Sequence, residues 1–153
     1  DNIERLTNIV EALNEIALTQ TIVLPLHPRT KGILLENKIE LHSNIKLIEP
    51  VGYLNMVWLL EHCSLVMTDS GGLQKEAYFF KKPCITMRDE TEWVELVENN
   101  FNVLVGALKG NIVEAYAQFN FSENYSCNLY GNGNASNLIV SKLLESEKMD
   151  SSL

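Results

Sequence analysis

A serine followed by two glycines is the part of this sequence best suited to bind an anion. The apolar residues 64–68 predict a buried strand, and residues 73–80 predict a helix. Between these two segments lie Ser70, Gly71 and Gly72. Paired glycines let a ligand approach the backbone because no Cβ atom blocks it. The exposed N–H groups of the first helical turn and the helix dipole favour a phosphate there, and the Ser70 hydroxyl adds a donor.

A carboxylate follows the turn at a distance that suits a sugar. Glu76 lies four residues after Gly72, about one turn into the predicted helix. A carboxylate repels phosphate but accepts two hydrogen bonds from a ribose diol, so the arrangement describes a nucleoside phosphate. The alternative is that Ser70 caps the helix and the glycines only permit a tight turn. The segment fits neither a P-loop nor a GxSxG nucleophile elbow.

Two other polar residues follow predicted strands, at the edge where open α/β sheets bind ligands. Arg88 comes directly after the predicted strand 84–87. It can meet a phosphate or form an ion pair with Asp89 or Glu92, and the sequence leaves both open. His27 follows another predicted strand and is either a polar group at this edge or a turn residue. We favour the first interpretation.

No metal or cofactor site is predicted. An acidic run could suggest a metal, but no histidine accompanies it, so a solvated helix start is the better interpretation. Its members are Asp89, Glu90, Glu92 and Glu95. Three cysteines lack a CxxC pair and predict free thiols in a reducing compartment. They are Cys63, Cys84 and Cys127.

The charge and the apolar pattern narrow the partners. The 153 residues carry 12 Lys and Arg against 20 Asp and Glu, a formal net charge of −8, which predicts no nucleic-acid partner. No apolar run is long enough to cross a bilayer, so we expect no membrane partner. Residues 1–4 lack the features of a secretory signal, which predicts a cytoplasmic protein, and they lack an initiator methionine, from which we expect a chain cut from a longer one.

Strands and helices alternate along the sequence. Short apolar runs predict strands at 21–26, 45–48, 64–68, 84–87 and 102–105. Helical spacing predicts helices over 3–16, 54–62, 73–80, 92–98, 110–119 and 135–144, with a helix cap at Asp1 or Asn2, and residues 121–134 predict a loop. The fold class is therefore α/β, a Rossmann-like parallel sheet with helices on both faces. The first predicted element is a helix, whereas such a fold usually begins with a strand, so the first strand of the fold can be missing from this chain. We expect one domain over 1–147 and a disordered tail over 148–153.

Together these segments resemble the non-hydrolysing UDP-N-acetylglucosamine 2-epimerases. The resemblance rests on TDSGGLQKEA at 68–77, KPCITMRDETEWVE at 82–95 and NVLVG at 102–106. LHPR at 26–29 and YGNGNAS at 130–136 fall where that family has similar segments. The resemblance covers nearly the whole chain.

The resemblance implies one half of a glycosyltransferase-B-type fold, in which two Rossmann-like domains face each other across a cleft. It implies an isomerase of polysaccharide biosynthesis that eliminates UDP from UDP-N-acetylglucosamine, leaves an unsaturated sugar and re-adds UDP to give the manno isomer. The family's acid/base carboxylates belong to the N-terminal domain. We therefore expect no catalytic residue in this chain, which would act with the missing N-terminal domain in a homodimeric enzyme without a cofactor.

The resemblance also assigns residues to the parts of UDP. Ser70, Gly71 and Gly72 match the diphosphate-binding residues, and Glu76 matches the ribose ligand. Arg88 lies in a segment that lines the same cleft.

Two positions depart from the family pattern. Met56 stands where relatives often have an aromatic residue beside the uracil, and its thioether can still cover a ring face. Asn132 replaces an acidic residue. The alternatives are a 2-epimerase of another UDP-2-acetamido sugar, a UDP-sugar-dependent glycosyltransferase, or a binding module without catalysis.

Overall fold

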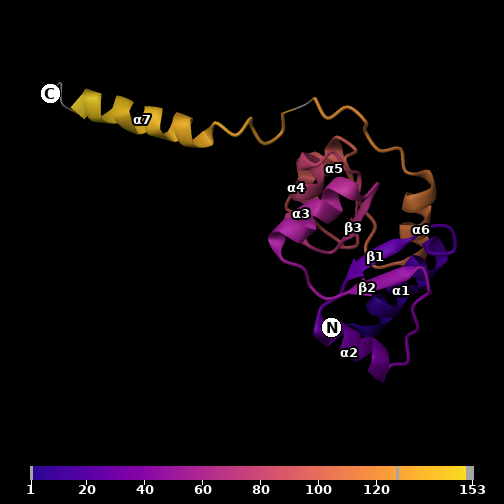
Figure 1. The fold of residues 1–153 in the computed structure, drawn as a ribbon. Helices are drawn as coiled ribbons and strands as arrows, with labels where there is room; N and C mark the ends of the chain where they lie inside the picture. The colour runs from indigo at the N-terminus through magenta and orange to yellow at the C-terminus, as the bar shows by residue number, and fades with distance from the viewer. Residues whose placement is uncertain (1, 127, 151–153) are drawn as a thin grey trace. The chain divides into compact units, whose positions relative to one another are not determined.

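The structure is a computed structural model that describes residues 2–126 and 128–150 (Figure 1). The chain falls into two compact units, Asp1–Glu123 and Asn124–Leu153. The predicted cap at Asp1, the predicted free thiol of Cys127 and residues 151–153 of the predicted tail lie outside the described residues. The assignment of residues 1–147 to one domain stays a prediction.

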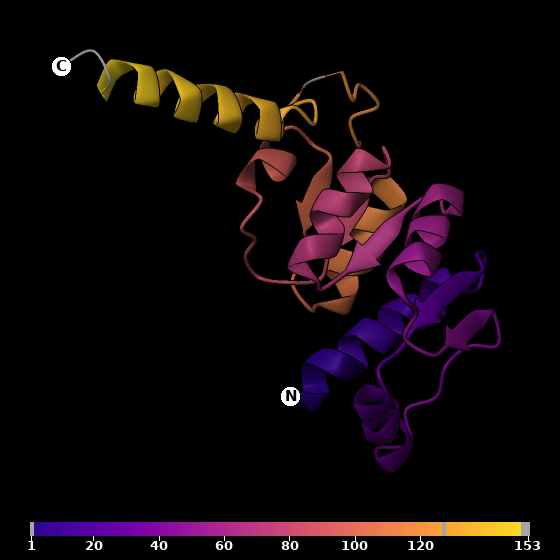
Figure 2. The same cartoon turned by 60° about the vertical axis from the view of Figure 1, so that its left-hand side comes forward.

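Short parallel strands alternate with helices in the first unit (Figures 1 and 2). Its strands are β1 (Ile22–Pro25), β2 (Ile45–Ile48), β3 (Val66–Thr68), β4 (Cys84–Thr86) and β5 (Asn102–Leu104). Its helices are α1 (Ile3–Ile16), α2 (Pro28–Glu36), α3 (Tyr53–His62), α4 (Gly71–Phe79), α5 (Val94–Glu98) and α6 (Lys109–Gln118). The prediction of an α/β fold with parallel strands is confirmed.

The five strands form two hydrogen-bonded sheets, where the sequence predicted one. β1 pairs with β2, and β4 lies between β3 and β5. Every pair is parallel, with Ile22 opposite Ile45 in the first sheet and Val66 opposite Cys84 in the second. Side chains join the two sheets where backbone bonds do not, because Met67 of β3 packs in the same apolar cluster as Ile22 of β1.

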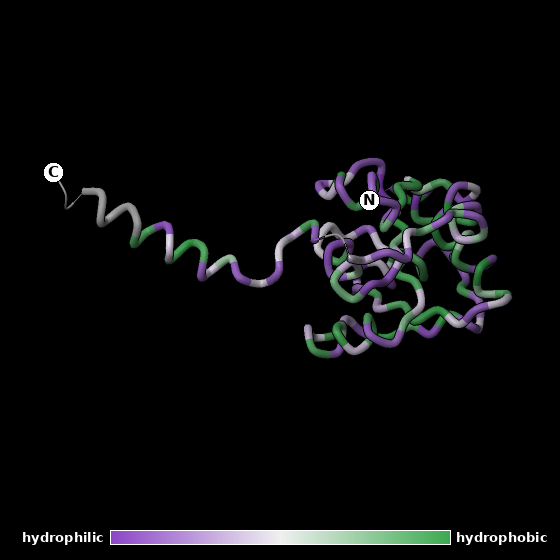
Figure 3. The backbone as a smooth tube through the Cα atoms, turned by 90° about the horizontal axis from the view of Figure 1, so that it is seen from above, coloured by the Kyte–Doolittle hydropathy of each residue, from purple (hydrophilic) through white to green (hydrophobic). Residues whose placement is uncertain are grey.

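Helices cover both faces of the three-stranded sheet. Consecutive side chains of a strand point to opposite faces. Ile85 of β4 packs with residues of α1 and α6, including Ala12 and Ile112. Cys84, the neighbouring residue, packs on the other side with residues of α3 and α4, including Leu60 and Ala77. Hydrophobic and hydrophilic stretches alternate along the chain path of this unit in Figure 3, as this layering requires. The sheet is thus fixed from both sides, and its strand ends have defined positions.

Helix α2 was not predicted from the sequence. It begins at Pro28, and the Nδ1 atom of His27 accepts a hydrogen bond of 3.3 Å from the Arg29 N–H. Proline suits the first helical position because it has no N–H to leave unpaired. Only Leu34 of this helix is buried, so the apolar repeat that reveals a helix is weak here.

The second unit contains helix α7 (Ala135–Asp150), which extends beyond the predicted end at residue 144 and includes residues 148–150 of the predicted tail. Residues 128–134, which precede α7, belong to the predicted loop, and Gly131 and Gly133 there have φ angles of +79° and +82°. A positive φ is strained for any residue with a Cβ atom, which explains glycine at both positions.

Cys63 and Cys84 are free thiols. Burial raises the pKa of the Cys84 thiol to about 12, so this cysteine remains protonated and unreactive at neutral pH.

Candidate functional site

Ser70, Gly71 and Gly72 lie at the carboxyl end of β3, as predicted, and we refer to these three residues as the turn. The two glycines are the first residues of α4, which the sequence predicted to begin at residue 73. β3 ends at Thr68 and α4 begins at Gly71, with Ser70 at the N-cap position. The side chain of Ser70 makes no capping hydrogen bond, whereas its backbone N–H donates to Oγ1 of Thr68 at 2.9 Å. Capping therefore does not account for the serine. Its exposed hydroxyl stands beside the first N–H groups of a helix of nine residues, where an anion is favoured.

The two glycines face different surroundings. A Cβ atom on Gly71 would lie 3.1 Å from Oε2 of Glu92 and 3.4 Å from a guanidinium nitrogen of Arg88. A Cβ atom on Gly72 would meet nothing within 4 Å, and Gly72 does not have a positive φ. Space inside the protein therefore constrains Gly71. At Gly72 the backbone is open to solvent and, by the same token, to a ligand.

Arg88 lies beside this turn and forms the ion pair that the sequence left open. Its guanidinium makes two hydrogen bonds to the carboxylate of Glu92, at 3.1 and 2.9 Å. These bonds raise the pKa of Arg88 and lower the pKa of Glu92. Both groups are therefore charged at neutral pH, and a positive and a negative group compete at the edge of the turn.

Asp89 pairs with a different arginine. Arg5 of α1 donates to the Asp89 carboxylate at 2.9 and 3.2 Å. Asp89 also leaves no space for a side chain at residue 106, because a Cβ atom added to Gly106 would lie 2.9 Å from an Asp89 oxygen. The φ angle of Gly106, +65°, favours glycine as well. A pocket of about 490 Å³ is lined by Arg5, Arg88 and Asp89, among other residues, and by residues 104–108 at and after the end of β5. Arg88 thus lies beside the turn and also lines this pocket.

The other predicted site residues are Glu76, Met56 and His27, and they lie on three different helices or helix ends. Glu76 is half-buried on α4, within the same helix as the glycines. Met56 of α3 packs against the cluster that includes Ala77 of α4. His27 follows β1 in the other sheet and caps α2, so the structure gives it the turn role that the sequence had left as the alternative. A place for His27 in the site stays a prediction.

A buried polar cluster behind the turn was missed in the sequence. The side chains of Gln74, Thr86 and Asn102 are all 0% exposed. The Thr86 hydroxyl donates to Asn102 at 2.8 Å, and the Asn102 amide donates to Oε1 of Gln74 at 2.9 Å. Buried polar side chains cost free energy unless they are paired, so three of them in one chain of bonds indicate a requirement for this geometry.

The acidic run does not converge on a metal position. Asp89 and Glu92 are bound to separate arginines. Among residues 2–126 and 128–150, the structure has no group of three metal-ligating side chains close enough to hold an ion. Within the same residues, no helix is long and apolar enough to span a bilayer.

Parallel strands covered by helices, with two glycines that open a helix directly after a strand end, define an α/β class of domain in which ligands bind at the carboxyl ends of the strands. The sequence profile of the UDP-N-acetylglucosamine 2-epimerase family matches residues 1–144, and the chain belongs to that family. The resemblance of its motifs to this family is therefore confirmed.

Curated relatives are similar to nearly all of this chain. A Pseudomonas aeruginosa UDP-2,3-diacetamido-2,3-dideoxy-D-glucuronate 2-epimerase is 53% identical over 145 residues, 94% of this chain and 40% of the relative. A Methanocaldococcus jannaschii UDP-N-acetylglucosamine 2-epimerase is 44% identical over 147 residues, 92% of this chain and 40% of the relative. The chain therefore spans 40% of the length of these two relatives.

Solved structures of the family share the fold. The UDP-GlcNAc 2-epimerase of Methanocaldococcus jannaschii aligns with a TM-score of 0.83 and 43% identity, over 95% of this chain and 42% of that protein. Its complex with UDP-GlcNAc and UDP aligns with a TM-score of 0.82 over the same shares of the two chains. The enzyme from Neisseria meningitidis bound to UDP-GlcNAc aligns with a TM-score of 0.70 and 34% identity, over 92% of this chain and 41% of that one.

Proposed function

We propose that the chain is the UDP-binding, C-terminal half of a cytoplasmic UDP-N-acetylglucosamine 2-epimerase that interconverts UDP-GlcNAc and UDP-ManNAc. In this proposal it forms one half of a glycosyltransferase-B-type fold, and an N-terminal domain carries the catalytic carboxylates. The observation that carries the proposal is the exposed Ser70-Gly71-Gly72 turn at the start of α4, in a chain of this family. The likeness to a relative crystallised with UDP-GlcNAc and UDP supports it.

The turn would hold the diphosphate. Backbone N–H groups at the start of α4 donate to phosphate oxygens, and the Ser70 hydroxyl adds one more donor. The open space at Gly72 lets a phosphate approach without displacing a side chain. Arg88 stands beside the turn and supplies a positive charge, which Glu92 partly neutralises.

The nucleoside would lie along α3 and α4. Glu76, one turn beyond the glycines, accepts hydrogen bonds from the two ribose hydroxyls. Met56 covers a face of the uracil with its thioether, in place of an aromatic ring. We propose that His27, which follows β1, is a polar group at the edge where the ligand binds.

In the proposed reaction this chain would act on the leaving group. A proton is removed from C2 and the C1–O bond to UDP breaks, which leaves an unsaturated sugar. The electron pair of the C1–O bond passes to the β-phosphate oxygen. Negative charge therefore grows next to the N–H donors of α4 and is stabilised by them. UDP then adds back, and a proton returns to C2 on the opposite face. The proton transfers fall to the N-terminal domain.

Other UDP-2-acetamido sugars are alternative substrates. The 53% identity to an epimerase of a UDP-diacetamido-glucuronate favours this second candidate. A UDP-sugar-dependent glycosyltransferase would bind UDP through the same residues but would transfer the sugar to an acceptor.

An assay in D2O tests the proposal. The full-length protein is incubated separately with UDP-GlcNAc and with UDP-2,3-diacetamido-2,3-dideoxy-D-glucuronate, and the sugar protons are followed by NMR. We expect the manno isomer to form with deuterium at C2, since that proton leaves and solvent returns another. The substrate with the larger kcat/KM identifies the sugar. Release of UDP with neither isomer nor deuterium at C2 would contradict the proposal and favour transfer.

A further inference from the structure

Two side chains bind the carbonyl groups of the turn from behind. The Nε2 group of Gln74 donates to the carbonyl oxygen of Ser70 at 3.3 Å. The indole N–H of Trp93 donates to the carbonyl oxygen of Gly71 at 2.8 Å. The indole comes from the segment before α5, 22 residues along the chain, so this contact exists only in the folded protein.

Fixing a carbonyl group fixes the N–H group of the next residue. The peptide bond is planar and trans, so the C=O of one residue and the N–H of the following residue lie in one rigid unit and point in opposite directions. A bond to the Ser70 carbonyl therefore orients the Gly71 N–H, and a bond to the Gly71 carbonyl orients the Gly72 N–H. These are the first N–H groups of α4.

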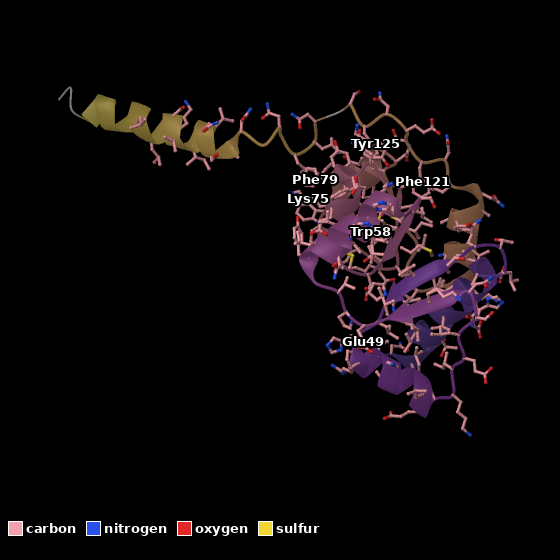
Figure 4. The ribbon with its side chains drawn as sticks, viewed as in Figure 1. Glu49, Trp58, Lys75, Phe79, Phe121 and Tyr125 are labelled. Carbon is pink, nitrogen blue, oxygen red and sulfur yellow. The ribbon has the colours of Figure 1, made fainter. Side chains whose placement is uncertain are left out.

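The two donors are held by one hydrogen-bonded network, in which Gln74 is buried and Thr91 and Trp93 are half-buried. Oε1 of Gln74 accepts from the Thr91 hydroxyl at 2.6 Å, in addition to its bond from Asn102. The same Thr91 oxygen accepts the backbone N–H of Trp93 at 3.1 Å. Lys75 of α4, labelled in Figure 4, covers the indole with its ammonium group 4.5 Å from the ring centre. Thr91 thus links the glutamine and the tryptophan and limits the movement of both.

We infer that Gln74, Thr91 and Trp93 are positioning residues, which orient the N–H groups of Gly71 and Gly72 toward the diphosphate of a bound nucleotide. The inference rests on the proposed function, because it assigns these residues to the same UDP site. Glycine has the widest backbone freedom, so a helix that opens with two glycines gains from external bonds that keep its first donors aligned. Donors aligned in advance do not have to be ordered when the ligand binds.

The replacement Trp93→Phe tests the inference in the full-length protein. It removes the indole N–H and keeps an aromatic ring under Lys75. Calorimetry is expected to give about tenfold weaker UDP binding, as for loss of one well-oriented hydrogen bond to a charged group. Uridine, which has no phosphate, is expected to bind unchanged in an NMR titration.

The other tryptophan supplies a matched control. Trp58 of α3, labelled in Figure 4, is 58% exposed. Its ring stacks on that of His62, with 4.2 Å between the ring centres. Trp58→Phe is expected to change neither affinity. Equal UDP affinity for Trp93→Phe and the unaltered protein would overturn the inference, and so would equal losses for UDP and uridine. If the unaltered protein bound no UDP, the proposed function would be overturned, and the inference with it.

A pair of changes at Thr91 keeps the test decisive if Trp93→Phe does not fold. Thr91→Val has the same shape but no hydroxyl, so it frees both Gln74 and Trp93, whereas Thr91→Ser retains the hydroxyl. We expect Thr91→Val to weaken UDP binding severalfold and to leave uridine binding unchanged. Thr91→Ser is expected to bind UDP like the unaltered protein. Weak binding by both variants, or by neither, would overturn the inference.

Discussion

At the scale of single residues, the Cβ atom that Gly72 lacks is the feature that bears most directly on the proposed ligand. Its missing Cβ leaves space that no protein atom fills within 4 Å, and its φ angle is not positive. Neither packing nor backbone conformation therefore requires glycine at this position. A phosphate that approaches the backbone does require it.

Gly72→Val is expected to abolish detectable UDP binding and leave the fold intact. The branched side chain would occupy the approach to the N–H donors. In a helix, valine is no worse than glycine, so the free energy of unfolding should change by less than about 1 kcal/mol. Calorimetry measures UDP binding, and circular dichroism with urea measures stability.

Gly32 of α2 offers a matched control for this change. A Cβ atom there also meets nothing within 4 Å, and Gly32 lies within a helix that follows a different strand. Gly32→Val should bind UDP like the unaltered protein. Normal UDP binding by a folded Gly72→Val protein would place the phosphate elsewhere.

Glu76 tests where the ribose lies. If its carboxylate accepts the ribose diol, Glu76→Ala should weaken UDP binding by about 1.5–3 kcal/mol, as for hydrogen bonds to a charged group. UDP built on deoxyribose offers one hydroxyl fewer, so the same change should cost that ligand much less. Calorimetry with both ligands on both proteins separates the contributions. Equal losses would mean that Glu76 acts through the fold and makes no bond to the sugar.

At the scale of elements, the segment between β4 and α5 carries competing charges to the turn. Arg88 offers a positive charge to a phosphate, while the Glu92 carboxylate already occupies its hydrogen-bonding groups. Hydrogen bonds from Arg88 lower the pKa of Glu92 and so favour its charged form. A phosphate must therefore share or replace an existing partner, which limits the contribution of this arginine.

Arg88→Ala is expected to weaken UDP binding, leave it measurable and make it less dependent on salt, because one charge is lost and the backbone donors remain. Glu92→Gln should act in the opposite direction and tighten UDP. Calorimetry at low and high salt measures both effects. Lys109→Ala is a control of equal charge, since Lys109 pairs with Glu15 on α1. A loss of UDP binding in Arg88→Ala as complete as in Gly72→Val would contradict this ranking.

The elements around the turn were largely predictable, and the contacts that hold them were not. β3 and β4 follow from local apolar runs, whereas α4 begins at Gly71, two residues before the predicted start at residue 73. α2 escaped prediction because its apolar face is small and its signal lay in one His-Pro pair. The contact of Trp93 with the Gly71 carbonyl depends on how two distant segments pack, and no local pattern records it. The same holds for the division of five strands into two sheets.

At the scale of the whole molecule, the net charge of −8 sets how an anion can be bound. Long-range attraction does not gather a nucleotide diphosphate to an acidic protein. Binding must come from short-range donors in a fixed geometry, which is what the start of α4 and its buried polar support offer. In the proposed function, these donors hold the leaving group, and the acid and base at the sugar come from elsewhere.

The 153-residue chain alone is therefore expected to bind UDP without epimerising UDP-GlcNAc. General acid–base catalysis needs a side chain within hydrogen-bond reach of the reacting proton. In the proposed function that side chain belongs to a further domain, in keeping with relatives of which this chain spans 40%. The purified chain and the full-length protein would be compared by calorimetry with UDP and by NMR of UDP-GlcNAc in D2O. We expect UDP binding by both, and conversion with deuterium at C2 by the full-length protein alone. Turnover by the chain at a comparable rate would show that it contains its own acid and base, and that the division of labour proposed here is wrong.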